Sequence, residues 1–93
     1  MTEPWFVYML QCADGSPYLG ITNHVAERVA AHNGGKGPDY TRRHRPVQLI
    51  YEELHDDKRS ARKREIELKG WRREKKLALA RGFPSSAAGA SSG

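Results

Sequence analysis

The sequence predicts an α+β protein with a three-stranded antiparallel sheet, in the order 2-1-3, flanked by helices. Residues 5–12, WFVYMLQC, are apolar on both alternating faces, as expected of a central strand that is covered on two sides. Residues 18–22 form a second short strand, and residues 47–54, VQLIYEEL, alternate well enough for a third. Because only the first segment is apolar on both faces, we place it in the middle of the sheet.

The connection between the first two strands predicts a tight hairpin. Residues 13–15, ADG, are typical of a type I turn followed by a glycine in the left-handed region, which closes a three-residue loop. In that register Tyr8 lies opposite Gly20, and Tyr8 and Tyr18 are diagonal neighbours on one face. A two-residue turn would instead place the two tyrosines on opposite faces of the sheet.

A helix is predicted between the second and third strands. Thr22 or Asn23 caps it, it runs to about residue 33, and two glycines at 34–35 end it. The remaining segments are a basic loop or short helix at 36–46, a helix at about 58–70 that Asp56 or Asp57 caps, and a shorter helix at 71–81 after an interruption at Gly70.

Two polar residues of the first helix are candidates for a functional role. On a helical wheel Val25 and Val29 define the buried stripe of this helix, with the alanines at 26 and 30 beside it. Arg28 and His32 lie together at one margin of that stripe. We therefore expect their side chains to flank the sheet rather than to point into bulk water.

The helix at 58–70 carries a glutamate in an apolar stripe. Ala61, Glu65, Leu68 and Arg72 recur at helical spacing, so Glu65 lies between two core residues. A buried carboxylate is costly unless it is paired or binds a metal. Taken by itself, Glu65 is more simply interpreted as an ion-pair partner of Lys69 or of a nearby arginine.

Length and composition restrict the class of protein. The 93 residues, with 38% hydrophobic and 29% charged residues, predict one globular domain at 1–82 and a flexible low-complexity tail at 83–93. The single Cys12 excludes an internal disulfide framework and a cysteine-rich zinc site. No run of about 18 apolar residues and no signal-peptide pattern are present. We therefore expect a cytoplasmic protein.

The net charge of +5 is unevenly distributed. Residues 58–76 hold ten Lys or Arg and three Glu, whereas residues 1–57 hold five Lys or Arg and eight Asp or Glu. Within residues 1–57, basic side chains nevertheless cluster at 36–45. Basic clusters attract polyanions such as nucleic acid, although solvated helix faces with internal ion pairs produce similar charge runs.

In combination, these residues resemble the GIY-YIG nuclease family over about residues 5–80. The tripeptides at 6–8, FVY, and 18–20, YLG, resemble its two name-giving motifs, although the first lacks its glycine. Arg28 matches an arginine on the following helix, and His32-Asn33 matches a His-Asn pair at the end of that helix. Two further segments resemble family signatures, KGPDYT at 36–41 in small single-domain bacterial members and EIELK at 65–69 around a metal-binding glutamate.

The resemblance implies metal-dependent endonuclease chemistry on phosphodiester bonds, in DNA repair or structure-specific cleavage. Glu65 would hold one Mg²⁺ or Mn²⁺, and Arg28 would clamp the scissile phosphate. Tyr8 or Tyr18 would accept a proton from the attacking water, and the choice between them stays open. His32 would hydrogen-bond the phosphate or hold a tyrosine. A phenol with a pKa of about 10 is a poor base, so a neighbour must lower that pKa or share the proton.

The nucleic-acid substrate, expected to be DNA, would contact the basic segment, and Gly20 would leave room for its backbone. The residues proposed for this contact are Lys36, Tyr40, Arg42, Arg43 and Arg45. Many family members have a late active-site asparagine, and this chain has asparagine only at 23 and 33. Members also acquire their targets through attached domains, so a protein partner that supplies target recognition is expected here.

Two other classes of function compete with the nuclease. A binding module that kept the fold and the basic surface but lost catalysis would bind phosphates without sequence preference. A protein-interaction domain would instead use its basic helix to meet an acidic partner. The nuclease is favoured because Tyr8, Tyr18, Arg28 and Glu65 are all present, and a pure binder has no need for a carboxylate beside its basic surface.

Overall fold

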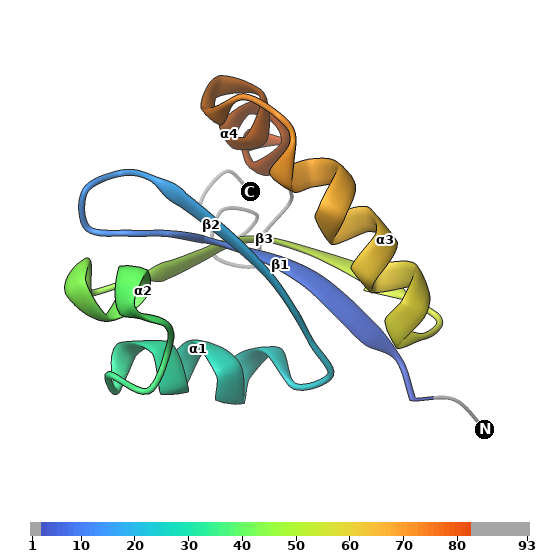
Figure 1. The fold of residues 1–93 in the computed structure, drawn as a ribbon, viewed down its shortest axis with the longest axis horizontal. Coiled ribbons are helices and arrows are strands. Elements are labelled where there is room, and N and C mark those ends of the chain that lie inside the picture. The colour runs from blue at the N-terminus through green and yellow to red at the C-terminus, as the bar shows by residue number, and fades with distance from the viewer. Residues whose placement is uncertain (1–2, 83–93) are drawn as a thin grey trace, which may run out of the picture.

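The computed structural model describes residues 3–82, so the tail predicted at 83–93 lies outside the described residues (Figure 1). The elements follow in the order β1 (Trp5–Gln11), β2 (Pro17–Thr22), α1 (Val25–Asn33), α2 (Asp39–Arg43), β3 (Gln48–His55), α3 (Lys58–Lys69) and α4 (Arg73–Arg81). The strands form one antiparallel sheet in the order β2-β1-β3. The predicted fold class and strand order are confirmed.

The β1–β2 hairpin has the predicted three-residue loop. Gly15 takes a positive φ of 87°, which other residues rarely adopt. The backbone N–H of Cys12 donates to the carbonyl of Ser16 at 2.9 Å, and this bond closes the loop. Tyr8 pairs with Gly20 and Leu10 pairs with Tyr18, so both tyrosines lie on one face of the sheet.

Helices cover both faces of the sheet, with α1 and α2 on one side and α3 and α4 on the other (Figure 1). Because side chains alternate along a strand, β1 supplies residues to both faces. Val7 and Met9 belong to a hydrophobic core on the α3 side. Tyr8 and Leu10 belong to a second core, against which Val29 of α1 packs. The central position of β1 therefore places Tyr8 between the sheet and α1.

Helix α1 differs from the prediction in its cap and in its buried face. The N-cap residue is His24, and its side chain makes no cap hydrogen bond. The side chain of Thr22 accepts the backbone N–H of His24 instead, at 3.1 Å. The alanines at 26 and 30 are exposed, whereas His32, predicted at the margin, is fully buried. The helix is turned so that a polar residue, rather than alanine, meets the sheet.

Helix α3 follows the prediction more closely. The side chain of Asp57 accepts the backbone N–H of Ser60 at 2.9 Å and caps the helix. Ala61, Glu65 and Leu68 are buried, as the stripe requires. Arg72 is exposed, contrary to that pattern, because α3 ends at Lys69 and Arg72 is the N-cap residue of α4.

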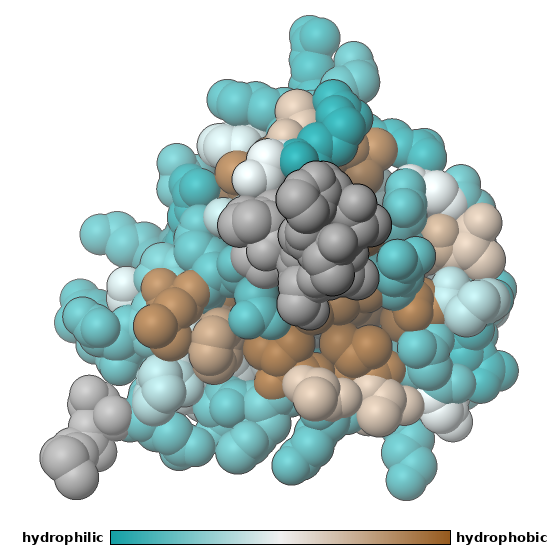
Figure 2. Space-filling model, turned by 180° about the vertical axis from the view of Figure 1, so that it is seen from behind, coloured by the Kyte–Doolittle hydropathy of each residue, from teal (hydrophilic) through white to brown (hydrophobic). Residues whose placement is uncertain are grey.

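The surface of the molecule is mostly hydrophilic. In the view of Figure 2, hydrophobic side chains gather in the middle of the face and hydrophilic ones surround them. Leu54 on β3 and Ile66 on α3 are the most exposed large hydrophobic residues described, at 64% and 62%. Within residues 3–82, no helix combines the length and the apolar character needed to cross a membrane.

Candidate active site

Tyr8 lies at the centre of the candidate site. Its side chain is buried, and its hydroxyl lies 3.0 Å from Nε2 of His32. The Nε of Arg28 donates to the same hydroxyl at 3.4 Å. Gly20 lies opposite on β2, where an added Cβ would come 2.5 Å from the hydroxyl oxygen. The space that we expected Gly20 to leave for a substrate is therefore filled by the phenol ring of Tyr8.

Tyr18 approaches the same histidine from β2. Its ring meets the ring of His32 edge-on at a centroid distance of 5.3 Å, and the ring of Tyr8 does so at 5.9 Å. Tyr18 is only partly buried, and no hydrogen bond to its hydroxyl is found within residues 3–82. The structure thus brings together the four residues predicted to be catalytic, which are Tyr8, Tyr18, Arg28 and His32.

The protonation states of these groups follow from burial and from the nearby charges. Burial raises the pKa of Tyr8, and the hydrogen bond and charge of Arg28 offset this only in part. Burial likewise raises the pKa of Tyr18, and the negative charge of Glu65 adds to the rise for both tyrosines. Burial and the charge of Arg28 lower the pKa of His32. At neutral pH the cluster therefore contains two neutral phenols, a neutral imidazole and one guanidinium.

Arg28 has a positive charge that no carboxylate of the described residues neutralises. Within residues 3–82, no Asp or Glu oxygen lies within 4.0 Å of its guanidinium nitrogens, and its one hydrogen bond goes to Tyr8. The residue is half-buried. A half-buried and uncompensated guanidinium is a ready partner for a phosphate group, to which it can donate two parallel hydrogen bonds.

Glu65 lies within electrostatic reach of both tyrosines and is nearly buried, at 7% exposure. Its oxygens pair with Nζ of Lys69 at 3.2 Å and with Nε of Arg62 at 3.7 Å. This is the ion pair that we considered as the simpler interpretation of the sequence. Both cationic side chains are more than half exposed, so a competing cation can displace them at little cost.

A single carboxylate is compatible with magnesium or manganese but not with a zinc site. Within the described part of the chain, no three His, Cys, Asp or Glu side chains lie close enough together to hold a metal ion. Zinc sites in proteins need three or four such ligands. Mg²⁺ keeps several waters and binds through one or two carboxylates together with substrate phosphates. Glu65 as the ligand of such an ion stays a prediction.

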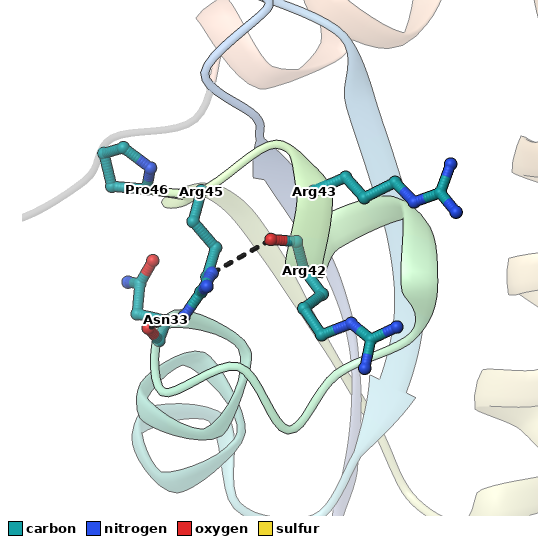
Figure 3. Close-up of a pocket in the computed structure, with 5 residues that line it drawn as sticks. All are labelled: Asn33, Arg42, Arg43, Arg45 and Pro46. Carbon is teal, nitrogen blue, oxygen red and sulfur yellow. Dashed lines mark hydrogen bonds between the residues drawn. The ribbon is translucent and has the colours of Figure 1, made fainter.

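A pocket of about 420 Å³ lies between the end of α1 and α2 (Figure 3). Its lining residues are Asn33, Arg42, Arg43, Arg45 and Pro46. Arg45 donates from Nε to the carbonyl of Arg42 at 3.0 Å and from Nη1 to the carbonyl of Asn33 at 3.3 Å. Arg42 pairs with Asp39, and Arg43 lies 4.0 Å from the same carboxylate. The pocket therefore contains a guanidinium that backbone carbonyls hold in place.

The other two residues predicted to bind nucleic acid have partners inside the protein. The hydroxyl of Tyr40 donates to Asp14 at 3.1 Å, and its ring packs on His44 at 4.4 Å. Tyr40 thus fastens α2 to the tip of the β1–β2 hairpin. Lys36 is exposed, and its backbone N–H closes the end of α1 on the carbonyl of Ala31. Only its side chain remains available for a phosphate.

Sequence reasoning assigned no structural role to three residues that support the site. The side chain of Thr41 is fully buried, and its hydroxyl lies 2.9 Å from Nδ1 of His32. A Cβ at Gly37 would collide with both of these atoms. Asn33 accepts the backbone N–H of Val47 at 2.7 Å and donates to its carbonyl at 3.0 Å, which ties α1 to the start of β3. The KGPDYT resemblance was the only signal for Gly37 and Thr41.

The family model for the GIY-YIG catalytic domain matches residues 4–78. The chain belongs to the GIY-YIG family. The matched residues contain the whole of the cluster around His32 and also Glu65. Membership in this family indicates nuclease chemistry in general, and the resemblance identified in the sequence is confirmed.

Proteins similar to this GIY-YIG domain occur in bacteria. A UPF0213 protein of Staphylococcus saprophyticus is 46% identical over 74 residues, which cover 80% of this chain and 90% of that protein. A UPF0213 protein of Staphylococcus aureus is 49% identical over the same length and coverage. The solution NMR structure of a UPF0213 protein from Bacillus halodurans has a TM-score of 0.58 at 34% identity, and the match covers 94% of this chain and 93% of that chain.

Proposed function

We propose that this protein is a divalent-metal-dependent endonuclease that hydrolyses phosphodiester bonds of nucleic acid, with DNA as the expected substrate. The observation that supports this most strongly is the position of Arg28. Its guanidinium has no carboxylate partner within residues 3–82, and it lies beside two phenols that the charge of Glu65 also reaches. Phosphodiester cleavage needs just such a fixed positive charge where negative charge develops in the transition state.

In this proposal Glu65 is the protein ligand of one Mg²⁺ or Mn²⁺ ion. When bound, such an ion polarises the phosphate and stabilises the leaving oxygen. Arg28 would donate hydrogen bonds to a non-bridging oxygen of the scissile phosphate. The phosphate replaces bulk water around the guanidinium, which strengthens the contact. Lys69 and Arg62, the exposed partners of Glu65, would give up this carboxylate to such an ion.

The attacking water needs a proton acceptor, and Tyr8 is better placed than Tyr18 for this role. A neutral phenol can accept a proton from water only if it gives its own hydroxyl proton to another group. The hydroxyl proton of Tyr8 can move to Nε2 of His32, 3.0 Å away, whereas the Tyr18 hydroxyl has no such acceptor within residues 3–82. The water oxygen then attacks phosphorus, the P–O bond to the leaving oxygen breaks, and that oxygen takes a proton from solvent. Tyr18 orients the water from the exposed side.

The pocket of Figure 3 extends the proposed interface away from the cleavage site. Arg43 and Arg45 contact backbone phosphates there, while Lys36 and Arg42 add positive charge. Tyr40 acts through the protein by holding α2 against the hairpin tip. Contacts of this kind fix the register of the strand without reading its sequence. We therefore place target recognition with a protein partner, and a role in DNA repair or structure-specific cleavage in the cytoplasm belongs to the same proposal.

Two observations favour a second candidate, a nucleic-acid-binding module without catalysis. Glu65 already has two cationic partners, and the late asparagine of many relatives is missing. One assay separates the two functions. Labelled linear and branched DNA and RNA are incubated with the protein and Mg²⁺, Mn²⁺ or EDTA. The nuclease cleaves at least one substrate with a metal ion and none with EDTA, whereas the binding module retards the same substrates in a gel and cleaves none.

A further inference from the structure

A chain of buried hydrogen bonds runs from Pro38 through Thr41 and His32 to Tyr8. The hydroxyl of Thr41 donates to the carbonyl of Pro38 at 3.1 Å. A carbonyl oxygen can only accept, and a hydroxyl has only one proton. The Thr41 oxygen therefore accepts its second hydrogen bond, from Nδ1 of His32 at 2.9 Å. The proton of the neutral imidazole is thus on Nδ1.

The other end of the chain leads to the same assignment. The Nε of Arg28 can only donate, so the Tyr8 oxygen accepts from it at 3.4 Å. The phenolic proton is then free to point at Nε2 of His32, 3.0 Å away. Nε2 must accept this proton, since Nδ1 already carries the proton of the neutral ring. A fixed acceptor at one end, the carbonyl of Pro38, and a fixed donor at the other, Nε of Arg28, therefore give the whole chain one direction.

Within the described residues, Thr41 is the hydrogen-bond partner that the buried Nδ1 of His32 has. His32 and Thr41 are both fully buried, so water does not compete for the ring nitrogen. A Cβ at Gly37 would strike both Nδ1 of His32 and Oγ1 of Thr41. The glycine thus lets the chain pass close enough for the two groups to meet. Thr41 itself sits in α2, the short helix that begins immediately after Pro38.

We propose that Thr41 is a positioning residue, whose hydroxyl holds His32 in the Nδ1–H tautomer so that Nε2 accepts the proton of Tyr8. Thr41 touches neither substrate nor metal in this arrangement. Its consequence for cleavage rests on the proposed function, because Tyr8 can take a proton from water only while Nε2 is unprotonated. A histidine in the wrong tautomer loses most of its value as a base.

The tautomer is measured directly, without any activity assay. Long-range ¹H–¹⁵N correlation spectra of the ¹⁵N-labelled protein at neutral pH distinguish a protonated ring nitrogen from an unprotonated one. The wild type should show Nδ1–H for His32. Thr41→Val has a similar shape but no hydroxyl, so a proton on Nδ1 would be buried without a partner. We expect the proton to move to Nε2 in this variant, whereas Thr41→Ser should keep the wild-type tautomer.

Cleavage rates supply the second readout. Thr41→Val should lower kcat by about 10- to 100-fold and leave KM unchanged. A loss of this size is part of the rate enhancement that a general base usually contributes. Thr41→Ser should restore a rate close to that of the wild type. Thr22→Val controls for the loss of a buried threonine hydroxyl, because the hydroxyl of Thr22 hydrogen-bonds to none of the four clustered residues and accepts the backbone N–H of His24 at the start of α1, a contact that affects stability. It should change neither the spectrum of His32 nor kcat.

Several results would overturn the proposal. A wild-type His32 with its proton on Nε2 does so without any variant, even if Thr41→Val fails to fold. A Thr41→Val protein that keeps Nδ1–H shows that the hydroxyl does not set the tautomer. A changed tautomer with an unchanged kcat removes the role in the reaction. If the wild type cleaves nothing, the proposed function fails, and the spectra alone still decide whether Thr41 sets the tautomer.

Discussion

Two polar clusters lie on opposite faces of the same sheet and use similar residue types. The first, on the α1 side, consists of the four residues predicted to be catalytic, which are Tyr8, Tyr18, Arg28 and His32. The second, which we call the Glu53 cluster, lies on the α3 side and consists of Tyr51, Glu53, His55 and Arg64. In it, Glu53 accepts hydrogen bonds from Tyr51 and Arg64 and lies 2.7 Å from Nε2 of His55. Each cluster thus combines tyrosine, histidine and arginine, but only the second has a carboxylate at its centre.

The carboxylate decides what each arginine can do. Burial by itself would raise the pKa of Glu53, but hydrogen bonds from Tyr51 and His55 and the charge of Arg64 hold it below its usual value. Burial and the neighbouring Glu53 raise the pKa of Tyr51 to about 12. Arg64 is neutralised by Glu53 and Glu67, so this cluster ties α3 to β3. Arg28 has no such partner within residues 3–82 and is left for a ligand.

The largest effect is expected from Glu65→Gln, which removes the charge of the predicted metal ligand and keeps its shape. Metal-dependent cleavage should fall by about three orders of magnitude or more, because several kcal/mol of transition-state stabilisation are lost. Stability should change by less than about 1 kcal/mol, since Lys69 and Arg62 are exposed partners. Mg²⁺ should raise the Tm of the wild type but not of the variant, as measured by thermal unfolding.

Glu67→Gln is the matched control for this prediction. Glu67 lies on the same helix, is more than half exposed and pairs only with Arg64 in the described residues. This variant should keep both cleavage and the Mg²⁺ effect on Tm. If Glu65→Gln instead unfolds about 1–3 kcal/mol more easily and Mg²⁺ affects neither protein, Glu65 is a structural ion-pair partner. The binding module would then be the better description.

The second effect compares the two arginines directly. Arg28→Gln should lower the cleavage rate by about 100-fold or more, because it removes a hydrogen-bonding charge at the reacting phosphate. Its stability should be nearly unchanged. Arg64→Gln should do the opposite, with normal cleavage and a loss of about 1–2 kcal/mol of stability, because Glu53 loses a charged partner. Urea unfolding and cleavage rates measured on both variants test the contrast, and equal behaviour of the two would refute it.

The fold was largely predictable from the sequence because its signals are local. The apolar residues of β1, the glycine at position 15 and the cap at Asp57 each fix one piece of geometry without help from distant residues. The register of the hairpin then follows, and with it the shared face of Tyr8 and Tyr18. The buried face of α1 was not predictable in the same way. A helical wheel selects apolar positions as buried ones. This helix instead buries His32, because Tyr8 on β1 and Thr41 on α2 provide hydrogen-bond partners for its ring.

The candidate site was predicted as a set of residues but not as a network. Periodicity and resemblance identified Tyr8, Arg28 and Glu65, yet they contain no information about which atoms meet. The role of Thr41 depends on a contact between α1 and α2 that no sequence spacing encodes. Tyr40 was assigned to nucleic acid from its place in a basic segment, and its hydroxyl is occupied by Asp14. Partner choice in such segments depends on tertiary contacts between side chains.

A third prediction concerns the basic pocket, where the ion pair of Arg43 with Asp39 is long and exposed, at 4.0 Å. Arg43→Gln combined with Arg45→Gln should weaken nucleic-acid binding for all sequences alike. The slope of log affinity against log salt should fall by about 2, one unit for each lost phosphate contact. The control is Arg59→Gln with Lys63→Gln, two exposed positions on α3. Equal slopes for the two double variants would mean that the pocket is not a preferred contact, and a wild-type slope near zero would favour an acidic protein partner.

The smallest effect concerns the pH dependence of stability through His32. The pKa of this buried ring is lowered below 6.5 by burial and by the charge of Arg28. As the pH falls through 6.5, the unfolded chain takes up a proton that the folded protein does not, so the free energy of unfolding decreases. The contribution is at most about 1.4 kcal/mol per pH unit. This contribution to the free energy of unfolding is complete above pH 6.5. It is lost progressively as the pH falls from 6.5 to the pKa of His32 in the folded protein.

An NMR titration of the His32 ring separates this contribution from those of the other three histidines. The midpoint in the folded protein should lie below 6.5, because protonation would place a second positive charge beside Arg28 and would remove the acceptor of the Tyr8 proton. A midpoint above 6.5 would require a carboxylate near the ring. In that case the two clusters would not differ in the way described, and Tyr8 would have no neutral base to receive its proton.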